Sequence, residues 1–238
     1  MQILDYIKYP WMLPSLTFNA KLNCEIKFIS EKIDLQKIKN EATKIINDEN
    51  FLKHKGDHSG GWGAIGLSTF GGNPENDLVT KEEIKPTRLL PKCPEVQKIL
   101  KLLPGTKQRV RFMEVTPGTR VFWHYDNGET IDNLDFTKNA RLHVPIFTNE
   151  DVEMNICHEQ IKWEEGKMYY GDFSFPHMIH NRSTKNRIHL VIDLKLTEEF
   201  LSLVPNYFMR IRKKRLFIKR LCQRSLNLYK KLNFVEND

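Results

Sequence analysis

The feature that most constrains this fold is a series of short apolar runs that begins near Arg109 and is repeatedly broken by turn residues. The runs read VRFMEV, VFWHYD, ARLHVPIFT, VEMNICH, MYYGDF and RIHLVIDLKL. Many short strands at this spacing favour a sandwich or barrel, since a parallel sheet would need helices between its strands. The last run alternates between an apolar face and a mixed face, which carry Ile188, Leu190, Ile192 and Leu194, and Arg187, His189, Val191 and Asp193.

Two further elements are expected before this β-region. The segment DLQKIKNEATKIIND has helical apolar spacing, and Asp34 is placed to cap the helix. The glycine-rich stretch GDHSGGWGAIGLSTFGGNPEN lacks the spacing of a phosphate-binding loop, and no Lys-Ser or Lys-Thr follows it. We therefore predict a short strand from Trp62 to Phe70 followed by a turn.

Composition and length indicate one folded core in a reducing compartment. The 238 residues are 40% hydrophobic, which suits a globular domain. The four cysteines are far apart and form no CxxC pair, so neither a disulfide scaffold nor a cysteine-based zinc site is expected. Asp5, Pro10 and Pro14 interrupt the segment where a secretory signal would be apolar, and no run reaches the length of a membrane span. We expect a cytoplasmic protein.

The positive charge of the chain is confined to its C-terminal part. Residues 201–235 contain ten Lys or Arg and no acidic residue, whereas residues 1–200 contain 27 basic and 28 acidic residues, a net charge of −1. The formal net charge of +7 therefore does not indicate a generally basic, nucleic-acid-binding surface. We do not expect nucleic acid as a partner.

We expect residues 1–200 to form one domain and residues 201–238 to add a basic amphipathic helix. Its apolar side is predicted to hold Tyr207, Ile211, Ile218, Leu221, Leu228 and Leu232. Three interpretations of this helix are open: packing on the barrel with solvated charges, binding to an anionic membrane surface, or binding to nucleic acid or an acidic partner. The second would make the protein peripheral to a membrane.

The motif with the clearest chemistry is His124-Tyr125-Asp126, followed 51 residues after Asp126 by His177. Residues i and i+2 of a strand share a face, so the first imidazole and the carboxylate can point to one place. A second imidazole from a distant strand would complete a facial triad, which suits non-haem Fe(II) and leaves three positions open. His180 competes with His177 as the third ligand.

Three further residues are candidates for binding an anionic co-substrate. Arg187 is ten residues after His177, and a buried guanidinium there would pair with a carboxylate. A sheet-edge pairing of Arg187 with Asp193 or Glu199 is the alternative. Arg141 and His143 share a face of the run ARLHVPIF, although a core role for this histidine is also open.

The stretch from Pro117 to Leu194 resembles the aspartyl/asparaginyl β-hydroxylase family of 2-oxoglutarate oxygenases, whose relatives include bacterial proline hydroxylases. The resemblance rests on PGTRVFWHYD, ARLHVPIFTNE, WEEGKMYYGDFSFPH and RIHLVIDL. It implies that His124 and His177 bind iron and that Arg187 binds the distal carboxylate of 2-oxoglutarate. Arg141 and His143 would then lie near the other end of 2-oxoglutarate.

Two positions depart from the peptide hydroxylases of this family. Asp126 stands where those enzymes have a glycine, and it matches the HxD motif of the proline hydroxylases. Met113 stands where a serine supports the distal carboxylate. The first departure favours a complete metal triad, and the second puts the serine contact in doubt.

We therefore predict a mainly β protein with flanking helices, a double-stranded β-helix (cupin-like jelly roll) over residues 105–197. The predicted activity uses Fe(II), O2 and 2-oxoglutarate to hydroxylate an unactivated carbon of an amino acid, or of an Asp, Asn or Pro side chain in a peptide. The partner would be a small molecule or a peptide. The alternatives are a lipid-acyl hydroxylase that the basic helix recruits to membranes, and a non-catalytic cupin-like binding module.

Overall fold

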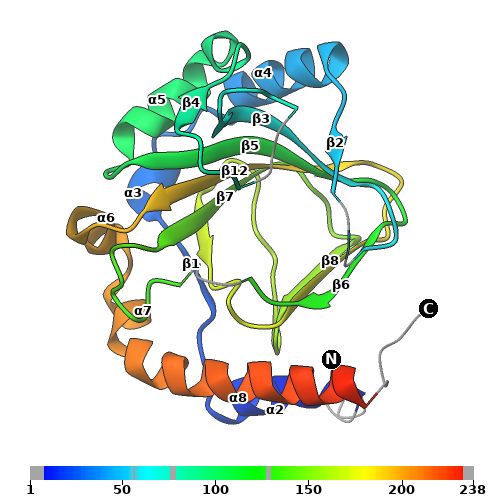
Figure 1. Ribbon diagram of the computed structural model, residues 1–238, viewed down its shortest axis with the longest axis vertical. Coiled ribbons are helices and arrows are strands. Elements are labelled where there is room, and N and C mark those ends of the chain that lie inside the picture. Colours follow the sequence, from blue (N-terminus) through cyan, green and yellow to red (C-terminus); the bar gives the residue numbers. More distant parts are fainter. Residues whose placement is uncertain (1–7, 55, 57, 76–78, 127–129, 233–238) are drawn as a thin grey trace.

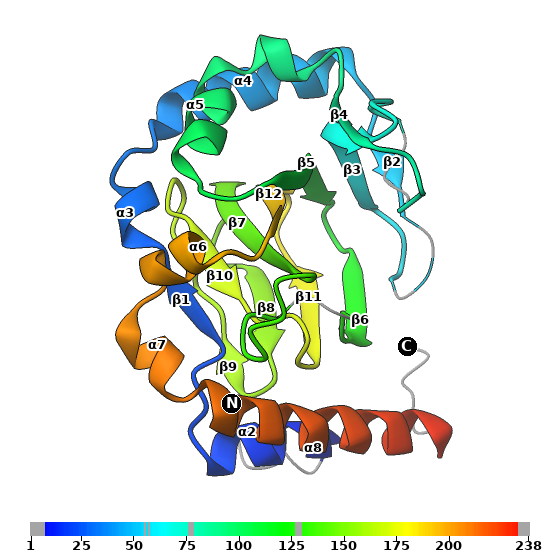
Figure 2. The same cartoon turned by 60° about the vertical axis from the view of Figure 1, so that its left-hand side comes forward.

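The computed structural model describes residues 8–54, 56, 58–75, 79–126 and 130–232. Within these ranges two antiparallel sheets face each other, and helices pack outside them (Figures 1 and 2). The larger sheet has the strand order β1-β10-β7-β12-β5-β3-β2, and β4 also pairs with β3. Its strands are β1 (Asn23–Glu25), β2 (Leu52–Lys53), β3 (Trp62–Phe70), β4 (Ile84–Pro86), β5 (Lys107–Val115), β7 (Asn139–Phe147), β10 (Tyr169–Gly171) and β12 (Arg187–Lys195).

The smaller sheet has the order β6-β11-β8-β9. Its strands are β6 (Arg120–His124), β8 (Val152–Ile156), β9 (Glu159–Gln160) and β11 (His177–Asn181). From β5 to β12 the chain passes repeatedly from one sheet to the other, which is the winding of a jelly roll. The predicted double-stranded β-helix is confirmed, and the strand expected at Trp62 to Phe70 is β3.

Strand β12 separates the helix-covered core from the barrel interior, as its alternating sequence predicts. Its apolar face includes Leu190 and Ile192, which are fully buried. They belong to one hydrophobic core with residues of the helices at 35–48 and 94–102. The opposite face carries Arg187, His189 and Asp193 into the interior, where each is almost completely buried. Buried charges need partners, so this polar face marks the part of the barrel where binding chemistry is concentrated.

Helices α4 (Leu35–Asp48) and α5 (Pro94–Leu102) cover the outer face of the larger sheet (Figure 2). The Asp34 side chain accepts a hydrogen bond from the Lys37 backbone, so the predicted cap of α4 is confirmed. The Glu41 carboxylate accepts hydrogen bonds from the backbone N–H groups of Glu95 and Val96 at the start of α5. This contact joins the two helices through the free donors of a helix N-terminus.

The remaining helices are short, except for the C-terminal α8. They are η1 (Pro10–Met12), α2 (Leu13–Thr17), α3 (Lys27–Ser30), η2 (Leu90–Lys92), α6 (Glu198–Leu203), α7 (Asn206–Arg210) and α8 (Arg212–Lys231). The single helix expected over 207–232 is divided at Ile211, where α7 ends and α8 begins. Helix α8 lies beneath the barrel against η1 and α2 (Figure 1).

The predicted apolar side of this helix is wrong in detail. Tyr207, Leu228 and Leu232 are exposed, and the buried side of α8 consists of Arg215, Ile218, Cys222 and Leu226. The reason is an ion pair inside the protein. Arg215 Nε donates to both oxygens of Asp132 at 3.0 and 2.9 Å, and both side chains are fully buried. This pairing turns a basic residue inward and leaves several apolar residues outside.

In the described residues, no helix combines the length and the apolar character that crossing a bilayer requires.

Candidate metal centre

Two strands of the smaller sheet bring the predicted ligands together. His124 ends β6, His177 begins β11, and the two residues are direct cross-strand partners. Their ring centroids are 4.2 Å apart, and His124 Nε2 is 3.9 Å from Asp126 Oδ1. One ligand atom from each of these three residues lies within 4.8 Å of the other two. The arrangement is that of two imidazoles and one carboxylate around a single point.

Backbone carbonyls orient both imidazoles. His124 Nδ1 lies 2.7 Å from the carbonyl oxygen of Phe122, and His177 Nδ1 lies 2.9 Å from that of Phe175. A carbonyl oxygen only accepts, so each Nδ1 carries the hydrogen and each Nε2 keeps its lone pair. Burial, with His124 nearby, lowers the pKa of His177 to about 3, so this imidazole is neutral. Both rings are therefore prepared as metal ligands.

The carboxylate of the triad is held by an arginine. Arg141 donates from NH1 to Asp126 Oδ2 and from Nε to Asp193 Oδ1, the second at 2.8 Å. The backbone N–H of Asp126 also donates to the Phe173 carbonyl at 2.8 Å. Asp126 lies just past the end of β6, so these contacts fix its position where strand geometry no longer does.

Asp193 anchors this network from the interior. Its carboxylate lies 3.2 Å from Arg109 and 3.3 Å from Arg111, in addition to Arg141. Burial alone would raise the pKa of Asp193, but the three guanidinium groups hold that pKa well below its usual range. Asp193 is thus an anion at neutral pH, and it forms ion pairs with all three arginines.

Among the described residues, Arg187 is a buried cation for which no ion pair with a carboxylate is found. It is 2% exposed, and its NH2 group lies 3.0 Å from His189 Nδ1 and 3.5 Å from Met154 Sδ. Its Nε has no hydrogen-bond partner, and no acidic side chain of the described residues forms an ion pair with it. The expected alternative, a pairing with Asp193 or Glu199, is absent from this part of the chain. Burial lowers the pKa of Arg187 to about 9.

His143 is buried beside the same arginine with both ring nitrogens unpartnered. Burial, together with Arg187 and Arg141, lowers its pKa well below the usual value, so the ring is neutral. Its ring centroid lies 4.9 Å from that of Phe173 and 5.7 Å from that of His189. An uncharged imidazole here can donate one hydrogen bond and accept one.

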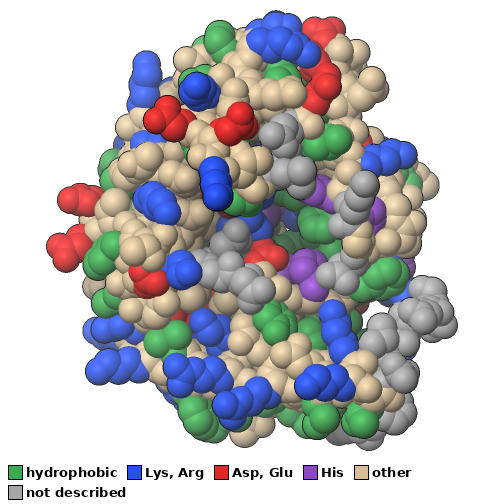
Figure 3. Space-filling model, in the orientation of Figure 1, with side chains coloured by type: hydrophobic (Ala, Val, Ile, Leu, Met, Phe, Trp, Pro, Cys, Tyr) green, Lys and Arg blue, Asp and Glu red, His purple; other side chains and the backbone are tan. Residues whose placement is uncertain are grey.

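These groups share one small cavity. It has a volume of about 60 Å³ and is lined by the triad together with Arg141, His143, Arg187 and apolar side chains such as Trp62, Met113 and Phe173. A second cavity of about 260 Å³ adjoins it and is also lined by Arg187 and Met154. Arg187 therefore lies between the His124-Asp126-His177 triad and the 260 Å³ cavity. Figure 3 shows histidine side chains exposed in the hollow on this face.

His180 lies on the opposite side of the smaller sheet. It is three residues after His177 on β11, and its cross-strand partners are Arg120 and Glu153. His177 and Ile179 line the metal cavity, and the residues between and after them point outward. The geometry therefore groups His177 with the other two ligands and leaves His180 outside.

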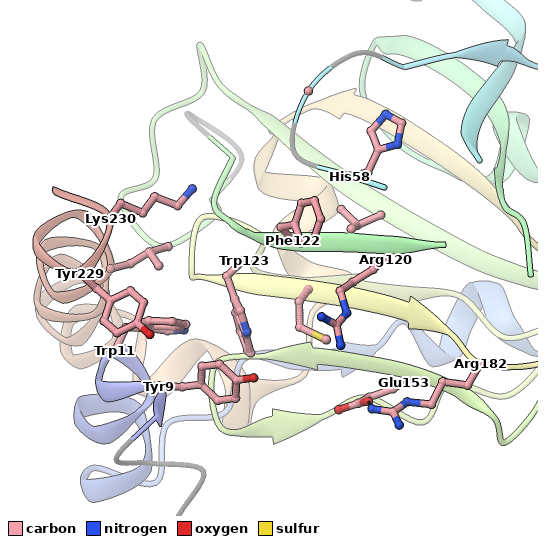
Figure 4. A pocket seen from close by; sticks show the side chains of 14 residues that line it. Tyr9, Trp11, His58, Arg120, Phe122, Trp123, Glu153, Arg182, Tyr229 and Lys230 are labelled. Carbon is pink, nitrogen blue, oxygen red and sulfur yellow. Dashed lines mark hydrogen bonds and ion pairs between the residues drawn. The ribbon is translucent and has the colours of Figure 1, made fainter. Parts of the chain in front are cut away.

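A larger cavity, of about 470 Å³, lies on the outer face of β6 and β11 (Figure 4). Between the pairs His177–His124 and Ile179–Val121, β11 advances two residues and β6 advances three. This bulge interrupts the alternation of β6, and Phe122 and Trp123 both line the cavity. Val121 lines both this cavity and the small one, but none of the three triad residues lines the larger cavity.

Sequence reasoning left two functional neighbours unassigned. His189 Nδ1 accepts a hydrogen bond from Arg187, and the Asp193 carboxylate accepts one from Arg141. The available signal was the mixed face of β12, which places both residues on the same face of the strand as Arg187.

The family described as Aspartyl/Asparaginyl beta-hydroxylase matches residues 32–196, which is more than half of the chain. The chain belongs to this family. The predicted resemblance is thus confirmed, and the protein is a hydroxylase-type enzyme by family. None of the curated proteins matches the chain significantly.

Solved structures with similar folds are distant in sequence. A viral collagen prolyl hydroxylase from Paramecium Bursaria Chlorella virus-1, in its 2OG complex, is 11% identical, with coverage of 75% of this chain and 98% of its own and a TM-score of 0.43. A prolyl-4-hydroxylase from Pseudomonas putida is 8% identical, with coverage of 69% and 89% and a TM-score of 0.40.

Proposed function

We propose that this chain is an Fe(II)- and 2-oxoglutarate-dependent dioxygenase that hydroxylates an unactivated carbon. The observation that carries the proposal is the combination of a facial His124-Asp126-His177 group with a buried, unpaired Arg187 on the wall of the same cavity. A metal-binding module alone would not need a buried cation without a counter-ion, because burying such a charge is costly.

The donor set fits Fe(II). Two imidazoles and one carboxylate on one side of an ion leave the other side open, which is the arrangement used by non-haem iron oxygenases. Asp126 would be the carboxylate ligand, and the guanidinium of Arg141 would hold its orientation. Asp193 would act through Arg141 as a positioning residue, since its carboxylate restrains the guanidinium from the far side.

The anion site fits a dicarboxylate co-substrate. The guanidinium of Arg187 would bind the distal carboxylate of 2-oxoglutarate, and its unpartnered Nε is a free donor for that purpose. Neutral His143 has a donor and an acceptor to offer the other end. Met113 lines the cavity where a serine is expected in the peptide hydroxylases, so this chain would rely on Arg187 and His189 instead.

When bound, Fe(II), O2 and 2-oxoglutarate supply the oxidising chemistry: one oxygen atom enters a substrate C–H bond as a hydroxyl, and the other ends in succinate as CO2 leaves. The protein side chains hold the reactants and exclude water. Trp62, Met113 and Phe173 form apolar walls beside the triad, which suits a reaction that water would divert.

The proposed substrate is an amino acid, or an Asp, Asn or Pro side chain in a peptide, and the proposed location is the cytoplasm. Family membership and the position of Asp126 support this choice, because the HxD pattern resembles that of proline hydroxylases. A lipid-acyl substrate remains the second candidate, which the exposed basic and apolar residues of α8 favour.

The proposal is tested by succinate release from 2-oxoglutarate, with Fe(II) and ascorbate and without a prime substrate. Wild type is expected to turn over slowly, and Asp126→Ala and His177→Ala are expected to abolish the reaction. His180→Ala is the matched control and should retain activity, because His180 lies on the other face of β11.

Binding measured under nitrogen separates the remaining outcomes. Binding of Fe(II) and 2-oxoglutarate without turnover would support the site and point to a requirement for substrate. Failure to bind either one would overturn the proposal and favour a non-catalytic cupin-like module.

A further inference from the structure

Exposed apolar side chains are concentrated at one end of this molecule. Of the eleven large hydrophobic side chains exposed in the described residues, seven lie within residues 13–18 and 207–232. Leu13, Leu16, Phe18 and Phe217 are between 38% and 57% exposed, although α2 and α8 pack against each other and against η1. Apolar groups clustered in this way on an otherwise well-packed protein indicate an interaction surface.

The same end carries the excess positive charge. The exposed side of α8 includes Lys213, Lys214, Arg220, Arg224 and Lys231, and residues 201–235 contain no acidic residue. In the described part of the chain, none of these five side chains forms an ion pair with a carboxylate. Figure 3 shows the resulting row of Lys and Arg side chains along α8.

The apolar and basic groups form one continuous surface. Lys214 Nζ lies 5.2 Å from the centre of the Phe18 ring, which joins α8 to the segment that follows α2. Phe217 is one helical turn after Lys214, so both point the same way from α8. We call this the α2/α8 surface; it comprises Leu13, Leu16, Phe18, Lys213, Lys214, Phe217 and Arg220.

We propose that the α2/α8 surface docks the enzyme onto an anionic lipid bilayer. An interfacial protein surface of this kind places apolar side chains at the boundary of the acyl chains and lets Lys and Arg bind lipid headgroups. A helix with merely solvated charges would have no reason to expose Phe217 between them. Nucleic acid would attract the charges, but it would leave the aliphatic side chains of Leu13 and Leu16 without a partner.

The surface is rigid before any membrane is met. Arg215, on the inner side of α8, binds buried Asp132 and also donates from NH1 to the Phe208 carbonyl at 2.7 Å. These contacts fix the rotation of α8 about its axis. The exposed residues are therefore already in place, and binding would not have to order the helix first. The inference concerns location alone and is independent of the proposed reaction.

Co-sedimentation of the full chain with vesicles tests the proposal. Binding is expected with vesicles of phosphatidylcholine and phosphatidylglycerol and should be weak with phosphatidylcholine alone. Lys213→Glu/Lys214→Glu/Arg220→Glu should lower the partition coefficient at least on the order of 100-fold, because each basic residue near an anionic surface contributes about 5-fold. Phe18→Ser/Phe217→Ser should weaken binding further at high salt, where screening removes the electrostatic part.

The matched control is Lys44→Glu/Lys85→Glu/Lys101→Glu, which makes the same charge change on exposed residues around α4, β4 and α5 at the opposite end of the molecule (Figure 1). It should bind vesicles much as the wild type does. Circular dichroism and melting temperature establish that each variant is folded. Equal loss in the control, or binding to a DNA duplex but not to vesicles, would overturn the proposal.

Discussion

Arg141 and Asp193 form the connection between the metal triad and the barrel interior. Arg141 Nε donates to Asp193 Oδ1 at 2.8 Å while the same guanidinium binds Asp126. Asp193 is in turn surrounded by two further arginines, Arg109 and Arg111. Arg187 stands outside this network, although it lies on the same face of β12. The site thus contains two kinds of cation. Arg109, Arg111 and Arg141 form ion pairs with Asp193, whereas Arg187 forms no ion pair with a carboxylate of the described residues.

The first prediction concerns Arg141→Lys. An ammonium cannot hold Asp126 and Asp193 in the planar geometry of a guanidinium. We expect Fe(II) affinity, measured by anaerobic calorimetry, to fall about 10- to 100-fold, the usual effect of losing an outer partner of a metal ligand. Arg109→Lys, at a second guanidinium on Asp193, is the control and should change Fe(II) affinity little. Unchanged Fe(II) affinity with a raised KM for 2-oxoglutarate would instead support the sequence-based prediction that Arg141 contacts the co-substrate.

The second prediction is that Arg187→Met stabilises the protein while it removes co-substrate binding. A buried charge without a partner costs folding energy, and replacing buried ionic groups by apolar ones has stabilised proteins by about 1–4 kcal/mol. Arg111→Met is the matched control: it is equally buried but paired with Asp193, so its loss should destabilise. Thermal unfolding with and without 2-oxoglutarate checks both effects. If Arg187→Met lowers the melting temperature, or still responds to 2-oxoglutarate, the assigned role is wrong.

The ligand triad and the polar face of β12 could be anticipated because both follow from short-range periodicity. Positions i and i+2 of a strand share a face, so the HxD motif and the alternation from Arg187 to Asp193 carry their own geometry. Strand length and spacing predicted a sandwich or barrel, and the jelly roll was predicted once the family resemblance was added. Which histidine completes the triad depended on the side of β11 that faces inward, and this came from the family resemblance and not from periodicity.

Features that depend on contacts between distant segments were not accessible. The β6 bulge breaks the alternation of the strand, so the consecutive residues Phe122 and Trp123 both line the outer cavity, and nothing in VFWHYD indicates this. The apolar side of the C-terminal helix was misassigned because Asp132, 83 residues earlier, draws Arg215 inward. A helical pattern counts apolar residues, and it has no means of identifying a buried ion pair.

The third prediction follows from the depressed pKa of Asp193. Its ordinary value is 3.8, and the arginines lower it in the folded state, so folding is favoured while the carboxyl is ionised. This stability is fully present above about pH 4 and is lost as the pH falls, because the unfolded chain then takes up the proton. The free-energy difference between wild type and Asp193→Asn, by urea unfolding, should be about 3–5 kcal/mol near neutrality and shrink below pH 4. Exposed Asp151→Asn should show little effect at any pH, and a difference for Asp193→Asn that does not vary with pH would contradict the argument.

The last prediction concerns the ion pair that sets the position of α8. Arg215→Met leaves Asp132 buried without its cation, so the free energy of unfolding should drop by about 3–5 kcal/mol. The double variant Arg215→Met/Asp132→Leu removes both charges and should recover most of that loss, because two apolar side chains can pack where the pair was. Denaturant unfolding of the four proteins of this cycle gives the coupling between the residues. Arg220→Met, on the exposed side of the same helix, is the control and should cost little. Additive effects of the two changes would mean that the pair does not anchor α8, and the rigidity inferred for the α2/α8 surface would then lose its basis.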